Sequence, residues 1–232
     1  MEKPHAPIGI FDSGLGGLSV LRALKQAFPA ENYLYLGDTA RLPYGSKSTR
    51  TIERYFFQNA EFLYRLGAKA LVVACNSASS ALVMNPELKK KLPLPAFNVI
   101  EPGVLAATTS SETGCLGLLA TRATVEAHAY DQCLQRMRGN HTLVSQPAPL
   151  LVPLVEEGWL DDPLTNLMIH RYTQRLTQSG VDTLILGCTH YPLLKTSIQK
   201  VVGNQITLID SGVSLAQAFQ SEASKAGFEM RT

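Results

Sequence analysis

Short apolar runs alternate with stretches of helical periodicity along almost the whole chain, and this alternation restricts the fold more than any other feature. Between the runs, apolar residues recur at helical spacing, for example over residues 18–28 and 48–67. Strands that are separated by helices pair as parallel βαβ units. The pattern therefore predicts an α/β fold of mostly parallel sheets flanked by helices. The runs expected to form strands cover residues 8–11, 33–38, 70–74, 115–120, 182–187 and 206–210.

The composition is that of a globular chain with a large core and little net charge. Of its 232 residues, 45% are hydrophobic and 17% are charged, and the formal net charge is +2. The longest basic run, at 89–91, fits a solvated helix end better than a nucleic-acid patch. No apolar run approaches the roughly 20 residues needed to span a bilayer, and the N-terminus does not resemble a signal peptide. We expect a cytoplasmic protein that binds neither nucleic acid nor membrane.

The chain has four cysteines, which lack the paired spacing of a disulfide framework. Cys115 and Cys133 are interpreted as small hydrophobic residues of the core. Cys75 and Cys188 differ, because each ends an apolar run and opens a polar segment, in VVACNS and LILGCTH. Near helix N-termini and hydrogen-bond donors, the pKa of a thiol can fall from about 8.5 towards neutrality, where the thiolate serves as a base or a nucleophile.

A second pair of matching segments suggests an internal repeat. The tripeptide at 12–14 and the tripeptide at 210–212 are both Asp-Ser-Gly, and each follows an expected strand. Chance similarity of strand ends explains this match as well as a repeat does. A repeat would predict two similar lobes whose strands end at a common cleft, which is where open α/β sheets bind ligands.

Two loops offer binding groups, and each also has a purely structural interpretation. The turn DSGLGG, which begins at Asp12, exposes backbone N–H groups at a helix N-terminus and suits an anion, or it simply needs the torsions of glycine. It lacks the full dinucleotide fingerprint. In the loop at 38–48, Pro43 fixes φ and Gly45 relaxes it, so that Tyr44 is presented on a rigid turn. Taken alone, this segment is equally well an ordinary surface loop.

Two thiols on facing lobes would permit a reaction that one thiol cannot perform without moving. Inversion of a carbon stereocentre removes a proton from one face and returns a proton to the other. Two bases that flank the carbon do this when one is a thiolate and the other a thiol, and their roles exchange with the direction of the reaction. The pattern thus favours proton transfer at carbon.

The order of five motifs carries a resemblance to a known family. The segments IGIFDSGLGGLSVL, GDTARLPYG, ACNSAS, PLVEEG and GVDTLILGCTHYPLL follow one another from Ile8 to about Gly212. In order and spacing they resemble the bacterial glutamate racemases, which belong to the cofactor-independent aspartate/glutamate racemase superfamily. The resemblance implies an isomerase that interconverts L- and D-glutamate, with no cofactor and no metal, and supplies D-glutamate for peptidoglycan synthesis.

The resemblance also implies a division into lobes and a set of site residues. It implies two pseudo-symmetric lobes, which we place at residues 1–97 plus 211–232 and at residues 98–210, with the active site between them. Cys75 and Cys188 match the family's catalytic cysteines. Assisting catalytic groups are Asp12 beside the first thiol and Glu156 and His190 beside the second, although the neighbouring Glu157 is an alternative to Glu156. The expected substrate-binding residues are Asp12, Ser13, Pro43, Tyr44, Gly45, Asn76, Ser77, Thr121, Thr189 and His190.

One position departs from the family. The family commonly has threonine where this chain has Ser77, so a hydroxyl is kept and a methyl group is lost. We expect a looser fit to the substrate and unchanged chemistry. The partner is expected to be a small molecule, glutamate, and a homodimer is common among proteins of this resemblance.

Three other functions compete with this interpretation. A racemase of broader specificity could also accept aspartate. A cysteine hydrolase or amidotransferase would use Cys188 with His190 and leave Cys75 idle. A structural zinc site would use all three side chains, although their spacing is unusual for zinc. A purely partner-binding role has no exposed amphipathic or charge-rich segment to support it.

Overall fold

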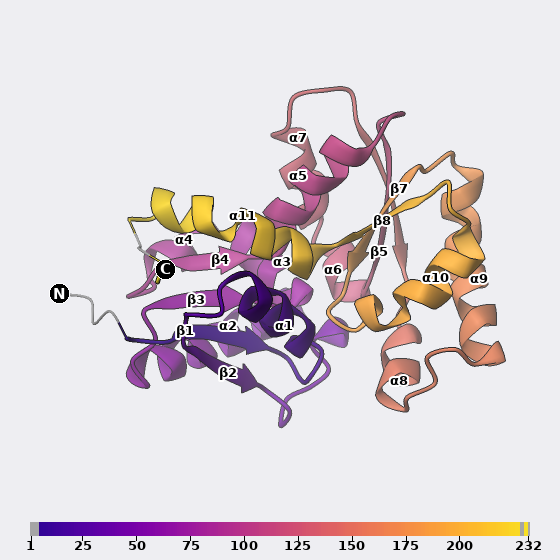
Figure 1. Cartoon of the computed structure of the whole chain (residues 1–232). Coiled ribbons are helices and arrows are strands. Elements are labelled where there is room, and N and C mark those ends of the chain that lie inside the picture. The colour runs from indigo at the N-terminus through magenta and orange to yellow at the C-terminus, as the bar shows by residue number, and fades with distance from the viewer. Residues whose placement is uncertain (1–4, 228–229, 232) are drawn as a thin grey trace.

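Two sheets of four parallel strands form the framework of this protein, as the computed structural model shows for residues 5–227 and 230–231 (Figure 1). The first sheet has the order β2-β1-β3-β4 and the second β6-β5-β7-β8. The predicted α/β fold of two lobes, with mostly parallel sheets, is confirmed. The strands are β1 (Ile8–Asp12), β2 (Tyr33–Gly37), β3 (Ala70–Val73), β4 (Ala96–Asn98), β5 (Cys115–Ala120), β6 (Thr142–Pro147), β7 (Thr183–Gly187) and β8 (Thr207–Asp210).

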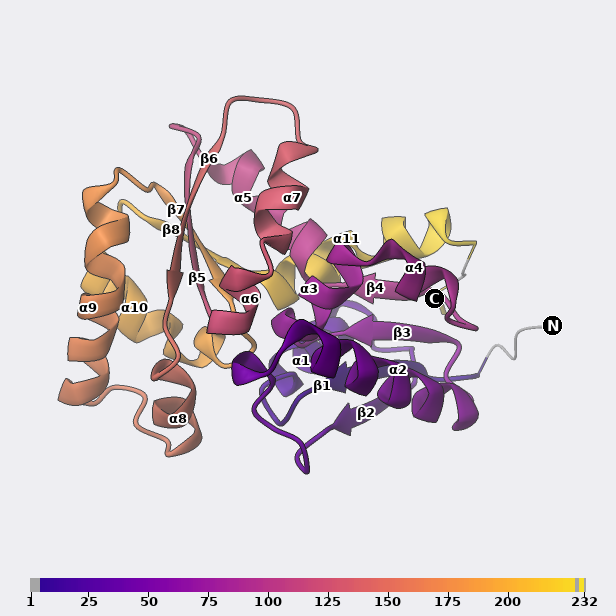
Figure 2. The same cartoon turned by 180° about the vertical axis from the view of Figure 1, so that it is seen from behind.

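Helices cover both faces of the first sheet (Figure 2). One face packs on α1 and α11, where Ile10 of the sheet meets Leu24 and Phe219 in one cluster. The other face packs on α2, α3 and α4, around Phe11 and Phe56. These helices are α1 (Leu18–Ala27), α2 (Thr49–Arg65), α3 (Asn76–Met84), α4 (Pro86–Lys90) and α11 (Ser211–Lys225).

The second sheet is covered in the same way. Leu186 lies in a cluster with α8, α9 and α10, whereas Ile185, which points to the opposite face, lies in a cluster with α5 and α7. The covering helices are α5 (Ile100–Ser110), α7 (Ala129–Gln135), α8 (Leu151–Glu156), α9 (Pro163–Gln178) and α10 (Lys195–Val202). Three short helical elements complete the two lobes. They are η1 (Tyr44–Ser46) after β2, α6 (Arg122–Glu126) after β5 and η2 (Tyr191–Leu194) after β7.

Local sequence signals set the ends of the longest helix. The Ser48 side chain accepts a hydrogen bond from the backbone N–H of Thr51 at the start of α2, as expected for a helix N-cap. Gly67 follows the helix with a φ of +85°, a conformation that glycine adopts without a steric penalty. Both ends of α2 therefore lie where the sequence predicts them.

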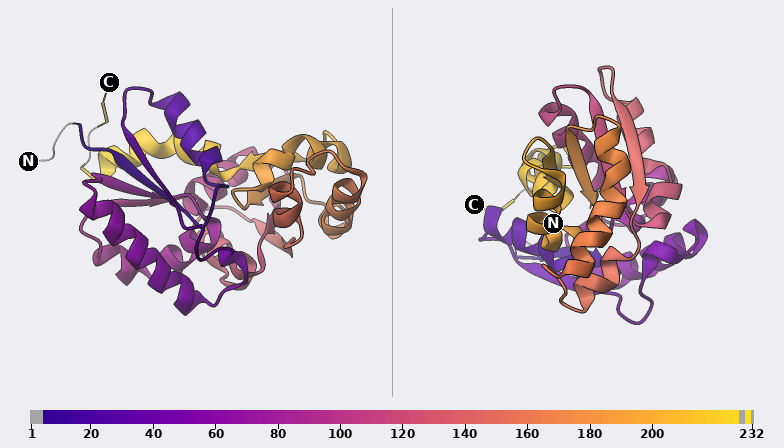
Figure 3. Two further views of the ribbon diagram at one scale, coloured as in Figure 1. Left: turned by 90° about the horizontal axis from the view of Figure 1, so that it is seen from below. Right: turned by 90° about the vertical axis from the view of Figure 1, so that its right-hand side faces the viewer.

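The chain passes between the lobes near residues 98–100 and 210–211. After β8 of the second sheet, α11 returns and packs against α1 of the first lobe (Figure 3, left, where the molecule is seen from below). This arrangement supports the proposed boundaries, 1–97 plus 211–232 and 98–210, which stay a proposal. Within the part of the chain that the structure describes, no helix has both the length and the apolar character to cross a membrane.

Three details differ from the sequence interpretation. β6, at Thr142–Pro147, is not among the expected strands. The proline-rich stretch at 84–97, which lies outside the runs expected to form strands, contains α4 and most of β4. Its strand is only three residues long, too short for a periodic signal. The matching tripeptides are also not equivalent, because Asp12 ends the second strand of its sheet and Asp210 the fourth. Cys75 and Cys188, by contrast, follow β3 and β7, which hold the same position in the two sheets.

The core of the second lobe generates a test of the fold. Leu186 is fully buried in β7, so Leu186→Ala should lower the free energy of unfolding by about 2–5 kcal/mol through loss of contacts and an unfilled cavity. Leu167, which is 48% exposed on α9, provides the control. Leu167→Ala should change the free energy of unfolding by less than about 0.5 kcal/mol. Urea denaturation followed by circular dichroism measures both, and equal effects would contradict the packing.

Candidate active site

A cavity of about 300 Å³ lies where the two lobes meet at the carboxyl ends of their strands. Both Cys75 and Cys188 line it. The fold brings these thiols to one cavity because parallel strands end at one edge of each sheet and the two edges face each other. The other predicted residues that line the cavity are Ser13, Pro43, Tyr44, Gly45, Asn76, Ser77, Thr121, Glu156, Thr189 and His190.

Cys75 is held at the start of α3, where it is the N-cap residue. Its side chain is 5% exposed, and its thiol donates to the hydroxyl of Ser13 over 3.6 Å. Asp12, which is fully buried behind the cavity wall, accepts from the backbone N–H of Gly14 at 3.0 Å and from the hydroxyl of Thr189 at 3.4 Å. The first thiol therefore has a carboxylate and a hydroxyl as neighbours.

Burial governs the protonation of this thiol and its neighbour. Desolvation raises the pKa of Cys75 to about 11, with a further increase from the charge of Asp12, against smaller opposing effects of hydrogen bonds from backbone N–H groups and Ser13. The pKa of Asp12 is also raised by burial, although hydrogen bonds and the nearby His190 oppose the change. Each negative charge disfavours the other, so the thiol and the carboxylate are not readily ionised at the same time.

Cys188 has a different set of neighbours, which form a relay to the solvent. Its sulfur lies 3.7 Å from Nδ1 of His190, and Nε2 of His190 lies 3.2 Å from Oε1 of Glu156. The side chain of Glu156 is 47% exposed and that of His190 is 11% exposed. Glu157, the alternative that the sequence left open, caps the end of α8 on the surface and does not line the cavity. Glu156, and not Glu157, thus lies beside His190 at the cavity.

The pKa of the second thiol is also raised rather than lowered. Burial is the main cause, and the negative charges of Cys75, Asp12 and Glu156 add to it, against a hydrogen bond from the backbone N–H of His190. The expectation that helix N-termini lower both thiol pKa values is therefore wrong for this structure. Desolvation by the closed lobes, which local sequence does not reveal, outweighs the nearby N–H groups.

A buried hydrogen-bond network fixes the loop that presents Tyr44. Asp38 accepts hydrogen bonds from the hydroxyl of Tyr44, from Nδ2 of Asn59 at 3.2 Å and from Nε of Arg41 at 2.9 Å. Desolvation would raise the pKa of this carboxyl, but the hydrogen bonds from Arg41, Tyr44 and Asn59 prevail and lower it. The loop predicted to be a rigid turn is therefore anchored to α2, and its backbone at Pro43 and Gly45 forms one wall of the cavity.

Hydroxyl and amide groups form a further part of the cavity wall. The hydroxyl of Ser77 lies 3.0 Å from that of Thr121 and 3.1 Å from that of Thr124, so it links α3 of the first lobe to α6 of the second. Next to it, Nδ2 of Asn76 is buried without a hydrogen-bond partner. An unpaired buried donor is costly, and this one belongs to a residue that lines the cavity.

Two glycines allow the lobes to approach closely around these groups. A Cβ atom on Gly45 would lie 2.8 Å from Cβ of Thr121 in the other lobe. A Cβ atom on Gly16 would lie 2.5 Å from Oγ1 of Thr189. Any larger residue at either position would force the lobes apart. The turn DSGLGG thus needs one of its glycines for contact between lobes, which its sequence alone did not show.

The sequence interpretation did not identify every residue of the cavity wall. Arg122 follows Thr121 at the start of α6 and is the only arginine or lysine among the lining residues that the structure describes. It adds a positive charge to a lining in which Glu156 is the only carboxylate among the described residues, and its position directly after a predicted binding residue was the only available signal. The remaining lining residues that were not predicted are Gly14, Leu42, Ser46, Pro149, Val152 and Pro153.

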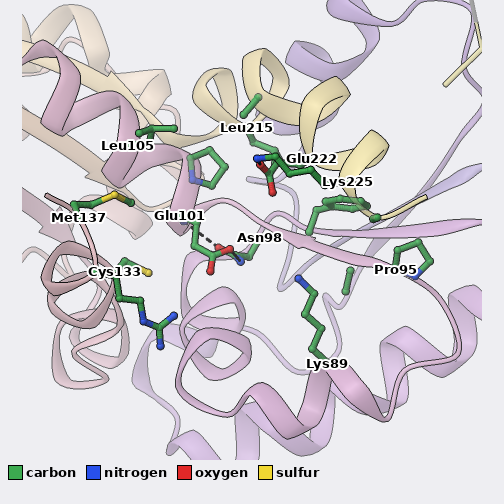
Figure 4. Close-up of a pocket in the computed structure, with 16 residues that line it drawn as sticks. Lys89, Pro95, Asn98, Glu101, Leu105, Cys133, Met137, Leu215, Glu222 and Lys225 are labelled. Carbon is green, nitrogen blue, oxygen red and sulfur yellow. Dashed lines mark hydrogen bonds and ion pairs between the residues drawn. The ribbon is translucent and has the colours of Figure 1, made fainter. Parts of the chain in front are cut away.

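A larger cavity, of about 610 Å³, lies between β4, α5, α7 and α11 (Figure 4). It contains none of the predicted site residues. Cys133 on its wall is 2% exposed, and burial, followed by the charge of Glu101, raises the pKa of this thiol to about 12. This agrees with its interpretation as a core residue, whereas Cys115 at the start of β5 is only half-buried.

The arrangement of ligating side chains bears on the zinc alternative. Among the residues described, no three His, Cys, Asp or Glu side chains are grouped in a way that could hold a metal ion. Cys75, Cys188 and His190 therefore do not form a ligand set of that kind. What the site does offer is two thiols around one small cavity, with Asp12 near one of them and His190 beside the other.

Comparison with known proteins identifies the family of this chain. The chain is 46% identical to a glutamate racemase of Syntrophus aciditrophicus over 212 residues, which are 91% of this chain and 78% of that protein. The crystal structure of glutamate racemase isoform RacE1 from Bacillus anthracis superposes with a TM-score of 0.92 at 35% identity, covering 97% of this chain and 84% of that chain.

A second crystal structure, of glutamate racemase from Francisella tularensis in complex with D-glutamate, has a TM-score of 0.88 at 33% identity and covers 99% of this chain and 86% of that chain. The sequence profile of the Asp/Glu/hydantoin racemases matches residues 8–219. The chain therefore belongs to the Asp/Glu/hydantoin racemase family and is an isomerase, a racemase of the class that its sequence predicts.

Proposed function

We propose that this protein is a glutamate racemase that interconverts L- and D-glutamate by proton transfer between two thiols. The observation that carries the proposal is the presence of Cys75 and Cys188 in one cavity, each beside its own proton-accepting group. Relatives of this chain named glutamate racemase, one of them crystallised with D-glutamate, support the choice of substrate.

The mechanism needs one thiolate and one thiol at a time. In one direction Cys75 has given its proton to Asp12, and its thiolate removes the proton from Cα on one face of the substrate. Cys188 then donates its proton to the opposite face, and His190, paired with Glu156, balances the charge. The reverse direction exchanges the two roles. No proton is gained or lost overall, and the proposal requires no cofactor.

The carbanion formed at Cα needs stabilisation, because the α-proton is a very weak acid. Fixed donors around the α-carboxylate supply it in a site that excludes water. The unpaired Nδ2 of Asn76 and the hydroxyl groups of Ser13, Ser77 and Thr121 are available on the cavity wall, and Thr189 lies beside them. The substrate-binding set predicted from the sequence remains our proposal for this role.

The wider context follows from this activity. We propose a cytoplasmic enzyme that provides D-glutamate for peptidoglycan synthesis, in the form of a homodimer. Aspartate, which is shorter than glutamate by one methylene, is the alternative substrate. A hydrolase built on Cys188, His190 and Glu156 would leave Cys75 without a task, although Cys75 lines the same cavity.

Isotope exchange tests the reaction itself. With L-glutamate in D₂O and no added cofactor, polarimetry should show loss of optical rotation, and the D-glutamate formed should carry deuterium at Cα. Proton transfer from solvent-equilibrated thiols gives this label. Product that keeps protium at Cα would refute exchange through two thiols, and a parallel assay with L-aspartate decides whether the broader specificity applies.

Single substitutions test the need for both thiols. Cys75→Ala and Cys188→Ala should each reduce kcat for racemisation by about 100-fold or more, because each removes a required acid or base. Cys115→Ala, at the start of β5 and outside the cavity, is the matched control and should retain activity. If only Cys188→Ala inactivates the protein, the hydrolase alternative gains and the two-thiol mechanism fails.

Alkylation of Cys75 tests the raised thiol pKa. The thiolate reacts with iodoacetamide, so a pKa of about 11 predicts a rate that rises about tenfold for each unit of pH between about 7 and 10, without a plateau. Asp12→Asn should increase the rate at a fixed pH, because removal of that negative charge favours the thiolate. Peptide mass spectrometry measures both rates. A plateau near neutral pH would contradict control by burial.

A further inference from the structure

Tyr130 makes a buried contact with a residue of the cavity wall and was not part of the predicted site. Its hydroxyl donates to Oδ1 of Asn76 over 2.7 Å. The two residues lie on different lobes, Asn76 at the start of α3 and Tyr130 on α7. Tyr130 is fully buried and Asn76 is 3% exposed, so water does not compete for this hydrogen bond.

The contact decides which end of the amide is left without a partner. A side-chain amide has an acceptor end, Oδ1, and a donor end, Nδ2. Since the hydroxyl of Tyr130 occupies Oδ1, the donor end is left free, and it is the atom that is buried without a partner. Burial raises the pKa of the Tyr130 phenol far above its ordinary value, so the proton that it donates is always present.

The backbone turns sharply just before Tyr130. His128, between α6 and α7, has a φ of +54°, a left-handed conformation that is uncommon for a residue other than glycine. The sharp turn allows α7 to begin directly at Ala129. Tyr130 then lies in the first turn of the helix, in the cluster of buried residues that includes Val83 of α3.

We infer that Tyr130 is a positioning residue, which reaches across the lobe interface and holds the Asn76 amide with its N–H donor aimed at a carboxylate of the bound amino acid. The inference rests on the proposed function, because it names the group of the substrate that the amide meets. Tyr130 does not line the cavity itself; it acts only through Asn76.

Tyr130→Phe is the direct test, with the purified full-length chain and the racemisation assay. Without the hydroxyl, the Asn76 amide can rotate. Substrate binding must then restrict that rotation, which weakens the binding of glutamate. We expect KM for glutamate to rise about three- to tenfold, the equivalent of one hydrogen bond of about 0.5–1.5 kcal/mol, with kcat changed much less. The control is Tyr33→Phe. The hydroxyl of Tyr33 lies 3.0 Å from the carbonyl oxygen of Leu24, away from the cavity, and its loss should leave KM unchanged.

A double-substitution cycle separates positioning from a general effect on stability. Asn76→Ala removes the donor, so adding Tyr130→Phe to it should raise KM no further. If the two effects multiply, or if Tyr130→Phe keeps the wild-type KM, the inference is wrong. A melting temperature for each variant identifies loss of folding, which would lower the amount of active enzyme and hence kcat without changing KM.

Asn76→Asp tests the direction of the amide. The aspartate keeps an acceptor for Tyr130 but turns a second carboxylate oxygen towards the substrate, so glutamate binding should weaken by far more than in Tyr130→Phe. If Asn76→Asp binds glutamate as well as the wild type, the acceptor end faces the cavity and the inference fails. A wild-type protein that does not racemise glutamate at all would refute the proposed function instead.

Discussion

The site depends on how closely the two lobes approach at the carboxyl ends of their strands. The approach is so tight that neither Gly16 nor Gly45 has room for a Cβ atom beside the other lobe. Hydrogen bonds cross the same boundary, from Thr189 to Asp12 and between the hydroxyl groups of Ser77 and Thr121. A site assembled in this way exists only when both lobes are folded and in contact.

The close approach of the two lobes changes the pKa of the two cysteines. Each thiol is nearly excluded from water, with Cys75 5% and Cys188 6% exposed, so each pKa rises and the ordinary state is the neutral thiol. A neutral thiol is a proton donor, and it becomes a base only when a neighbour takes its proton. In the proposed mechanism, those neighbours are Asp12 on one side and His190 with Glu156 on the other. The same burial strengthens every hydrogen bond that the cavity can offer to a carbanion.

The sequence predicted the strands better than it predicted their connections. Apolar runs such as those of β1 and β7 are buried on both faces, and the periodicity of α2 is equally clear. β4 and β6 were both missed, and β4 has only three residues. The two pairs of matching segments differ in this respect. The cysteine pair follows strands at equivalent positions of the two sheets, whereas Asp12 and Asp210 end strands at different positions. Asp210 caps α11 by accepting hydrogen bonds from two backbone N–H groups, which explains a similar tripeptide without a shared role.

The sequence by itself determined which reactive groups stand at the ends of strands, because the apolar pattern that marks a strand and its end depends only on neighbouring residues. It therefore singled out Cys75 and Cys188, and the resemblance of its motifs to a known family added most of the cavity wall. Only the tertiary structure decided between Glu156 and Glu157, gave the direction of both thiol pKa shifts and paired Tyr130 with Asn76. Those outcomes depend on groups far apart in the chain, 54 residues apart for Tyr130 and Asn76 and 177 for Thr189 and Asp12. Their separation and desolvation are properties of the packed lobes, which no local pattern contains.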